Sequence, residues 1–157
     1  MSEARILEKL TALGLELPPV ARPVASYVPV RVAGGLAFVA GQVAMVDGAV
    51  VHPGRVGAEI SLEDATAVAQ RCALQALAAL REELGSLDRL SGILQVTVFV
   101  ASAPGFNDQP KVANGASDLL VALLGEQGKH ARAAVGVAEL PLGAPVEVAV
   151  VAEVAGR

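Results

Sequence analysis

The segment 133–152, between Arg132 and Glu153, is almost entirely apolar, and it limits most strongly what this chain can fold into. Two glutamates and two prolines interrupt it: Glu139, Pro141, Pro145 and Glu147. These interruptions leave no uncharged apolar run of the roughly 20 residues that a membrane-spanning helix needs. Because proline lacks an N–H group, it fits a turn better than a central strand. The segment therefore predicts two strands, 132–140 and 146–154, joined by a Pro-Leu-Gly-Ala-Pro turn.

The first third of the chain predicts a short helix followed by antiparallel strands. A helix over residues 3–13 places Ile6, Leu7 and Leu10 on one face, and Gly14 can end it. The proline-rich passage 18–23 can be neither helix nor central strand, so we expect it to be an irregular connecting segment that lies on the surface of the domain. Strands over 27–32 and 36–39 flank Gly34-Gly35, a hairpin turn signal, and Asp47-Gly48 is a second one.

Two longer helices and another strand follow. Ser61 is placed to cap a helix, with Asp64 three residues later, and Gly85 stops it. Alternating valines predict a strand over 90–101, and a second helix begins near Pro110 and ends at Gly125. This order predicts an α+β fold, a sheet with two long helices on one face. The other face of the sheet must also be shielded from water, which favours oligomerisation.

Composition excludes several classes of protein. The mildly negative net charge of −4, with scattered Lys and Arg and few aromatic residues, argues against a nucleic-acid ligand. A single cysteine, Cys72, excludes an internal disulfide framework, so we expect a cytoplasmic protein. Cys72 is interpreted as an inert buried thiol. His52 and His130 lack metal-ligand spacing and are interpreted as surface or loop residues; no metal or cofactor is expected.

Arg132 is the first candidate site residue. On a strand it shares a face with Ala134, Gly136 and Ala138, and such small side chains leave space beside the guanidinium. That arrangement suits a pocket in which the planar fork of N–H donors binds a small carboxylate. Two alternatives stay open: an edge-strand arginine in water, or one paired with a carboxylate of the protein.

Glu147 is the second candidate, because a carboxylate between Val146 and Val148 should have a raised pKa, which suits proton transfer. The alternative is a solvent-facing strand residue. If the last two strands form a simple hairpin, Glu147 lies opposite Ala138 and Arg132 lies opposite Glu153, roughly 20 Å from the glutamate along the strand. Either the strands are not so paired, or the two residues act from different subunits.

Several motifs together resemble one family. Ala131-Arg132, Val135-Gly136-Val137, Leu140-Pro141 and Val146-Glu147-Val148 resemble the C-terminal signature of the Rid family, the YjgF-like reactive intermediate deaminases, also labelled endoribonuclease L-PSP. Phe38-Val39-Ala40-Gly41-Gln42 and Thr97-Val98-Phe99 resemble two of its strands. The match covers roughly residues 27–154, so the chain is divided into a lead-in, 1–26, and a Rid-like domain, 27–157.

The resemblance implies a chorismate-mutase-like mixed sheet and a homotrimer with sites between subunits. It implies hydrolysis of reactive enamines and imines to 2-keto acids and ammonia, without metal or cofactor. By the same resemblance, Arg132 holds the substrate carboxylate and Glu147 lies near the attacking water. The remaining pocket residues that it implies are Tyr27, Gly41, Asn114 and Ala134.

Departures from the family pattern keep other functions open. Ala40 stands where many members have serine, and Ala134 where many have cysteine, so two polar pocket groups are missing. The N-terminal helix and the loop 102–110 are longer than in compact members, which indicates a divergent branch. A carboxylate-binding trimer without turnover is one alternative, and a ribonuclease or translation inhibitor, as in the older family label, is the other.

Overall fold

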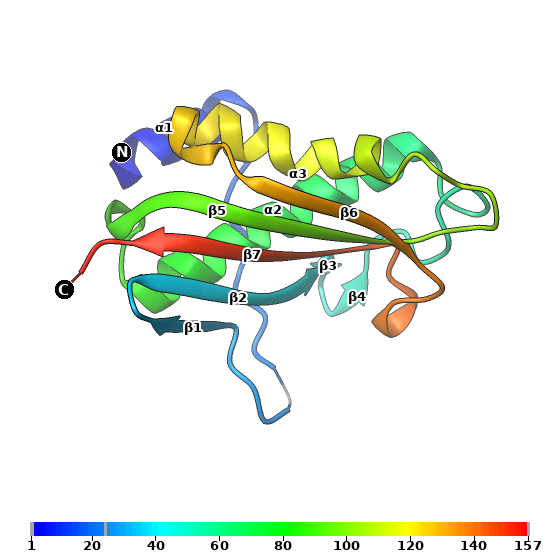
Figure 1. Cartoon of the computed structure of the whole chain (residues 1–157), viewed down its shortest axis with the longest axis horizontal. Helices are drawn as coiled ribbons and strands as arrows, with labels where there is room; N and C mark the ends of the chain where they lie inside the picture. The colour runs from blue at the N-terminus through cyan, green and yellow to red at the C-terminus, as the bar shows by residue number, and fades with distance from the viewer. Residues whose placement is uncertain (1, 24, 157) are drawn as a thin grey trace.

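The computed structural model describes residues 2–23 and 25–156, and it shows one mixed sheet with its long helices on a single face (Figure 1). The five-stranded sheet has the order β1-β2-β7-β5-β6. Only β5 and β6 are parallel; the other neighbours are antiparallel. The predicted α+β class, a mixed sheet with two long helices on one face, is confirmed. The elements are α1 Glu3–Ala12, β1 Val30–Ala33, β2 Leu36–Val43, β3 Met45–Val46, β4 Ala49–Val50, α2 Leu62–Leu84, β5 Leu90–Ala101, α3 Gln109–Leu124, β6 Ala131–Val137 and β7 Val146–Val154.

Local signals fix most of the element ends. Ser61 accepts a hydrogen bond from the Asp64 N–H at 3.0 Å, and Gly85 ends α2 with a positive φ of 79°. Both follow from the chemistry of helix caps. Gly34 and Gly35 have φ of 57° and 77°, the geometry that a tight hairpin between β1 and β2 requires.

Three predicted strand limits are wrong, one of them the end of β2, which runs to Val43 rather than to residue 39. β1 begins at Val30 rather than at residue 27, because Pro29 has no N–H to donate to the neighbouring strand; its carbonyl still accepts from the Ala40 N–H. β6 ends at Val137 rather than at residue 140, ahead of a short 3-10 turn, Pro141–Gly143.

The simple hairpin considered for the last two strands is also wrong. β6 and β7 both pair with β5 and not with each other. Arg132 lies opposite Val96, and Glu153 lies opposite Leu36 and Gly92. β5 lies between β7 and β6, and its alternating valines are buried on the helix side of the sheet.

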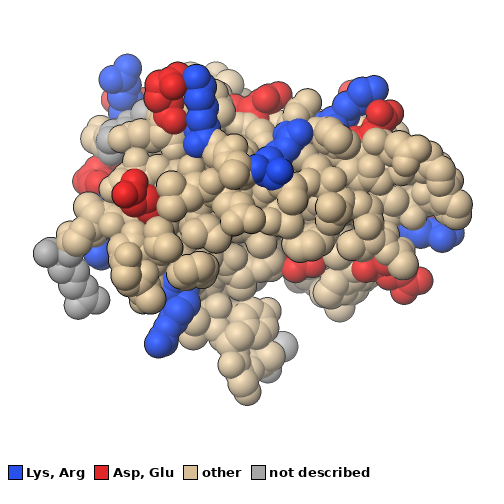
Figure 2. All heavy atoms as spheres, in the orientation of Figure 1, with Lys and Arg blue, Asp and Glu red and all other residues tan. Residues whose placement is uncertain are grey.

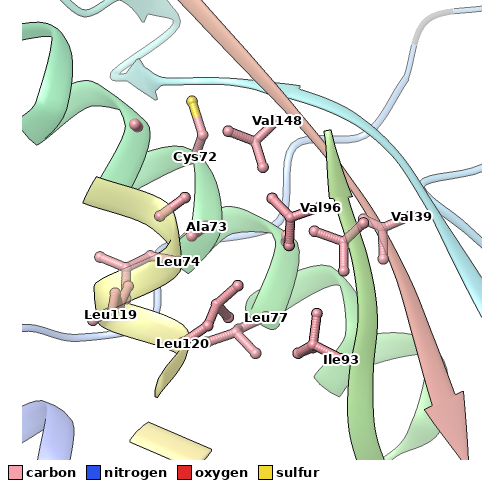
Figure 3. Close-up of a cluster of buried hydrophobic side chains, with 14 of the residues drawn as sticks. Val39, Cys72, Ala73, Leu74, Leu77, Ile93, Val96, Leu119, Leu120 and Val148 are labelled. Carbon is pink, nitrogen blue, oxygen red and sulfur yellow. The ribbon is translucent and has the colours of Figure 1, made fainter. Parts of the chain in front are cut away.

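The core lies between the sheet and α2, and α3 packs beside α2 (Figure 3). Cys72 is part of this core, as predicted, and burial raises the pKa of its thiol to about 12. The lead-in belongs to the same core, since Ile6 and Leu10 of α1 are buried in it. Lys9 also donates to the carbonyls of Ala122 and Leu123 at the end of α3.

The opposite face of the sheet carries no helix within the described residues. Figure 1 shows the strands in front of α2, and Figure 2, in the same orientation, shows a wide uncharged area over them with charged side chains mainly around its margin. Phe38 and Val135 are 46% and 42% exposed on this face. We call it the open face; its residues include Phe38, Thr97, Phe99, Ala133, Val135, Glu147, Ala149 and Val151.

None of the helices in 2–23 and 25–156 is long and apolar enough to cross a membrane.

Candidate functional site

Arg132 lies on the edge strand β6 and points toward α3. Its neighbour in β5 is Val96, which is buried on the helix side. Side chains of directly paired strand residues share a face, so Arg132 and Ala134 face the helices, as the alternation predicted. Ala134 is partly buried against the core beside the arginine.

Neutral groups of α3 hold the guanidinium in place. Arg132 Nη1 donates to Asn114 Oδ1 at 2.8 Å and to Ser117 Oγ at 3.2 Å, and Nη2 donates to the Pro110 carbonyl at 3.3 Å. All three acceptors are uncharged. They orient the side chain without neutralising its charge.

The charge of Arg132 has no carboxylate partner in the part of the chain that the structure describes. The ion pairs there are Arg22–Glu82, Arg81–Glu3, Lys111–Asp108 and Lys129–Glu126. Pairing with an internal acid such as Glu153 is therefore not seen. The guanidinium remains able to bind an anion from outside its own chain.

The unusual Asn114-Gly115 pair inside α3 has two separate explanations. Asn114 supplies the acceptor for Arg132. Gly115 lies against α2, where a Cβ would overlap the Thr66 carbonyl oxygen and stand 2.9 Å from its carbon. Two poor helix formers are therefore adjacent for different reasons: Asn114 orients Arg132, and Gly115 lets α3 approach α2 closely.

The open space beside Arg132 lies toward α3 rather than along Gly136. A Cβ at Gly136 would lie 2.8 Å from Gln109 Nε2 and 3.0 Å from Ser102 Oγ, so those side chains fill that position. A hollow of about 260 Å³ lies instead among Ser117, Val121, Lys129, His130 and Arg132. This volume suits a small molecule of a few heavy atoms.

Glu147 lies on the open face of β7, next to Gly41 of β2. A β-bulge between Val39 and Gln42 carries Gly41 toward the glutamate, so that a Cβ at Gly41 would overlap Oε1 and lie 2.8 Å from Cδ. Burial raises the pKa of Glu147 above the ordinary glutamate value. A carboxyl group whose protonated form is favoured in this way is better suited to donate a proton than an ordinary surface glutamate.

Tyr27 lies beside the same glycine. Both residues line a small hollow of about 100 Å³ together with Arg22, Gln42 and Gln75. Tyr27 is 58% exposed in this chain.

Sequence reasoning missed Gln75, Ser117 and His130. Gln75 is a buried polar residue of α2 that donates to the Val43 carbonyl and accepts from the Met45 N–H, which holds the strand end next to Gly41. An isolated glutamine on the apolar face of a helix is the signal that could have indicated it. His130 is indeed in a loop, but it is half-buried and both ring nitrogens have partners.

The candidate residues form two groups that do not meet within one chain. The arginine cluster is Asn114, Ser117, His130 and Arg132; the glutamate cluster is Tyr27, Gly41 and Glu147. Arg132 is two strands from Glu147 and three residues out of register with it, on the opposite face. Those offsets correspond to about 10 Å across the sheet and about 10 Å along it. Among the described residues, no group of three His, Cys, Asp or Glu could hold a metal ion.

Comparison with known proteins identifies the family. Residues 7–154 match the family model described as "YjgF/chorismate mutase-like, putative endoribonuclease". The chain belongs to this family. Protein TCP17 of Trypanosoma cruzi is 42% identical over 149 residues, covering 94% of this chain and 93% of that protein. The match to the family model includes the lead-in from residue 7 onward.

Solved structures agree with this assignment. Atu1372 from Agrobacterium tumefaciens, whose function is unknown, has a TM-score of 0.90 and 38% identity over 97% of this chain and 93% of its own. A protein from Shewanella oneidensis with the endoribonuclease label has a TM-score of 0.91 and 30% identity over 95% and 99% of the two chains. Escherichia coli TdcF with bound serine has a TM-score of 0.62 at 19% identity over 87% and 94%, which shows the shared fold alone.

Proposed function

We propose that this protein hydrolyses small reactive enamine and imine intermediates of amino acids to 2-keto acids and ammonia. One observation carries the proposal: the Arg132 guanidinium is held by three neutral acceptors and by no carboxylate among the described residues. Its planar fork matches the two oxygens of a 2-imino acid carboxylate. A substrate of this class is small enough for the hollow of about 260 Å³ beside it.

The reaction is proposed to occur between subunits of a homotrimer. In this arrangement the arginine cluster of one subunit faces the glutamate cluster of the next. Two observations support it: the clusters lie apart within one chain, and the apolar open face has no cover among the described residues. Burying that face against another copy would remove apolar surface from water.

The chemistry requires positioning and one proton-transfer group. Arg132 binds the carboxylate and places the C=N carbon near the Glu147 carboxylate. Starting from the protonated imine, ionised Glu147 accepts a proton from water as the water oxygen adds to that carbon, which leaves a hydroxyl and an amino group on it. The same carboxyl group then gives this proton to the amine nitrogen. As the C–N bond breaks and ammonia leaves, the hydroxyl group gives its proton to the Glu147 carboxylate and becomes the carbonyl of the 2-keto acid, and Glu147 finally releases that proton to solvent. Burial raises the pKa of Glu147, which supports a role in which the carboxyl group donates a proton as well as accepting one.

An ammonia-release assay tests this function. Imino acids are generated in place from several amino acids by an amino-acid oxidase, and ammonia formation is followed with wild type, Arg132→Ala and Arg132→Lys. We expect Arg132→Ala to lose all acceleration. Arg132→Lys should retain little, because an ammonium keeps the charge but loses the bidentate geometry. Wild-type rates in Arg132→Ala would refute the proposal.

A carboxylate-binding protein without turnover is the second candidate. It is favoured by Ala40 and Ala134, which place methyl groups where many family members have hydroxyl and thiol groups. Under this function, small 2-keto acids would raise the melting temperature of wild type but not of Arg132→Ala, and no ammonia release would be accelerated.

A further inference from the structure

The ring of His130 has its hydrogen-bonding direction fixed by its neighbours. Nδ1 lies 2.6 Å from the Gly128 carbonyl oxygen, and Nε2 lies 2.9 Å from Ser117 Oγ. A carbonyl oxygen can only accept, so Nδ1 must carry a proton. In the neutral ring Nε2 is then an acceptor, and the Ser117 hydroxyl donates to it.

Ser117 therefore connects the histidine to the arginine. Its proton is directed at His130, which leaves the oxygen lone pairs facing Arg132 Nη1 at 3.2 Å. Without the histidine, the hydroxyl could rotate, and its proton could point at the guanidinium. The ring thus keeps Ser117 as an acceptor toward Arg132.

The far end of this chain of hydrogen bonds is fixed to the backbone. Gly128 is buried against α3, where a Cβ would overlap the Leu120 carbonyl oxygen and lie 2.9 Å from the Val121 Cα. Such close contact leaves the Gly128 carbonyl little freedom to move. α3 therefore holds both Ser117 and the segment that orients His130.

We propose that Ser117 and His130 are positioning residues that orient Arg132 toward the substrate carboxylate. This inference rests on the proposed function, because it assigns these residues to the binding step of the same site. Asn114 and Ser117 both accept from Nη1, while Nη2 contacts only the backbone oxygen of Pro110. The guanidinium plane is thereby fixed, while the Nε–H and one N–H of Nη2 have no hydrogen-bond partner among the described residues. Arg132 itself lines the hollow together with Ser117 and His130, so these two donors are the ones we assign to the carboxylate.

The test uses Ser117→Ala with Ser117→Thr as its matched control, since threonine retains the hydroxyl. Long-range nitrogen NMR reports the tautomer of His130; the chain has only one other histidine, His52, and a His130→Gln variant assigns the signals. We expect one tautomer with the proton on Nδ1 in wild type. Its Nε2 signal should move to that of a free acceptor in Ser117→Ala and not in Ser117→Thr.

Binding of 2-oxobutyrate, followed by NMR titration, gives the second measurement. Ser117→Ala should weaken its Kd about tenfold, the size expected for one lost hydrogen bond to a charged group. Ser117→Thr should stay within about twofold of wild type. Thermal melting checks folding, because alanine in α3 should leave the helix as stable or more so.

Two results would overturn the proposal: a wild-type proton on Nε2, or an Nε2 signal and Kd unchanged in Ser117→Ala. A different result separates it from the proposed function. Suppose that neither wild type nor any variant binds 2-oxobutyrate, but the Nε2 signal depends on Ser117 as described. The hydrogen bonds from Gly128 through His130 to Ser117 are then supported, and the carboxylate site is refuted.

Discussion

The backbone of Gly41 lies so close to Glu147 that any side chain at residue 41 would occupy the space of the carboxylate. A Cβ there would overlap Oε1 and lie 2.8 Å from Cδ. Gly41 is not among the residues with positive φ, so its backbone conformation does not demand glycine. The requirement comes from proximity: the bulge in β2 leaves room for the carboxylate only while position 41 has no side chain.

Gly41→Ala should therefore reduce activity without unfolding the protein. The methyl group displaces the flexible end of Glu147, which lowers kcat roughly tenfold or more by misplacing the proton-transfer group. Stability should change by less than about 1 kcal/mol, because no backbone atom is crowded. Steady-state imine hydrolysis and thermal melting measure both effects. Gly156→Ala is the control, since nothing lies within 4 Å of a Cβ there. Equal kcat in Gly41→Ala and wild type would argue against this placement of Glu147.

Glu147→Gln should lower kcat by about 10²–10⁴, the usual loss on removing a general acid–base group. Its effect on stability should depend on pH. Burial raises the pKa of Glu147 in the folded protein, so the folded state favours the protonated form. That contribution is fully present below the unfolded pKa and is lost as pH rises through the raised folded pKa. Glutamine cannot ionise, so the melting temperature of the variant minus that of wild type should increase with pH. A difference that stays constant from acid to neutral pH would contradict this expectation.

Gly115→Ala should destabilise the protein although alanine is the better helix former. The added Cβ meets the Thr66 carbonyl, a backbone group of α2 that cannot move aside, and we expect a loss of about 1–3 kcal/mol. Chemical denaturation measures it. The neighbouring Asn114→Ala is the contrast: it should fold at least as well, because Asn114 is exposed on the helix, yet bind 2-keto acids more weakly through loss of the Arg132 partner. Equal stability of the two variants would show that the helices do not pack as described.

Phe38→Asp should weaken self-association. Phe38 is 46% exposed on the open face, and a charge there would have to be desolvated if that face packs against another copy. Analytical ultracentrifugation should show wild type as a trimer and the variant shifted toward smaller species, with ammonia release falling in parallel. Leu13→Asp is the matched control, since Leu13 is 54% exposed just after α1 and away from the sheet. A variant that remains fully trimeric would rule out this face as the interface.

Local chemistry explains why much of the fold could be predicted. Ser61 and Gly85 fix the ends of α2, and Gly34-Gly35 fixes the first hairpin, through interactions spanning only a few residues. The faces of β6 and β7 followed from simple alternation. Each of these features depends on a residue and its immediate neighbours, which is the information that periodicity and caps contain.

The pairing of strands could not be predicted in the same way. β6 and β7 follow each other in sequence, yet β5, about thirty residues earlier, lies between them. That order depends on burial over the whole sheet, in which β5 pairs with β7 along one edge and with β6 along the other while its valines are buried on the helix side. For the same reason Ser117 and His130 gave no sequence signal: their hydrogen bonds depend on the approach of α3 to the loop before β6.

The sequence alone determined the residue types of this protein: an arginine among small side chains, a glutamate among valines, and the helix and turn signals around them. Tertiary structure alone decided which groups meet. It gave Arg132 neutral partners on α3, put Gly41 against Glu147, and separated the two clusters, because strand order and helix packing follow from burial over the whole chain.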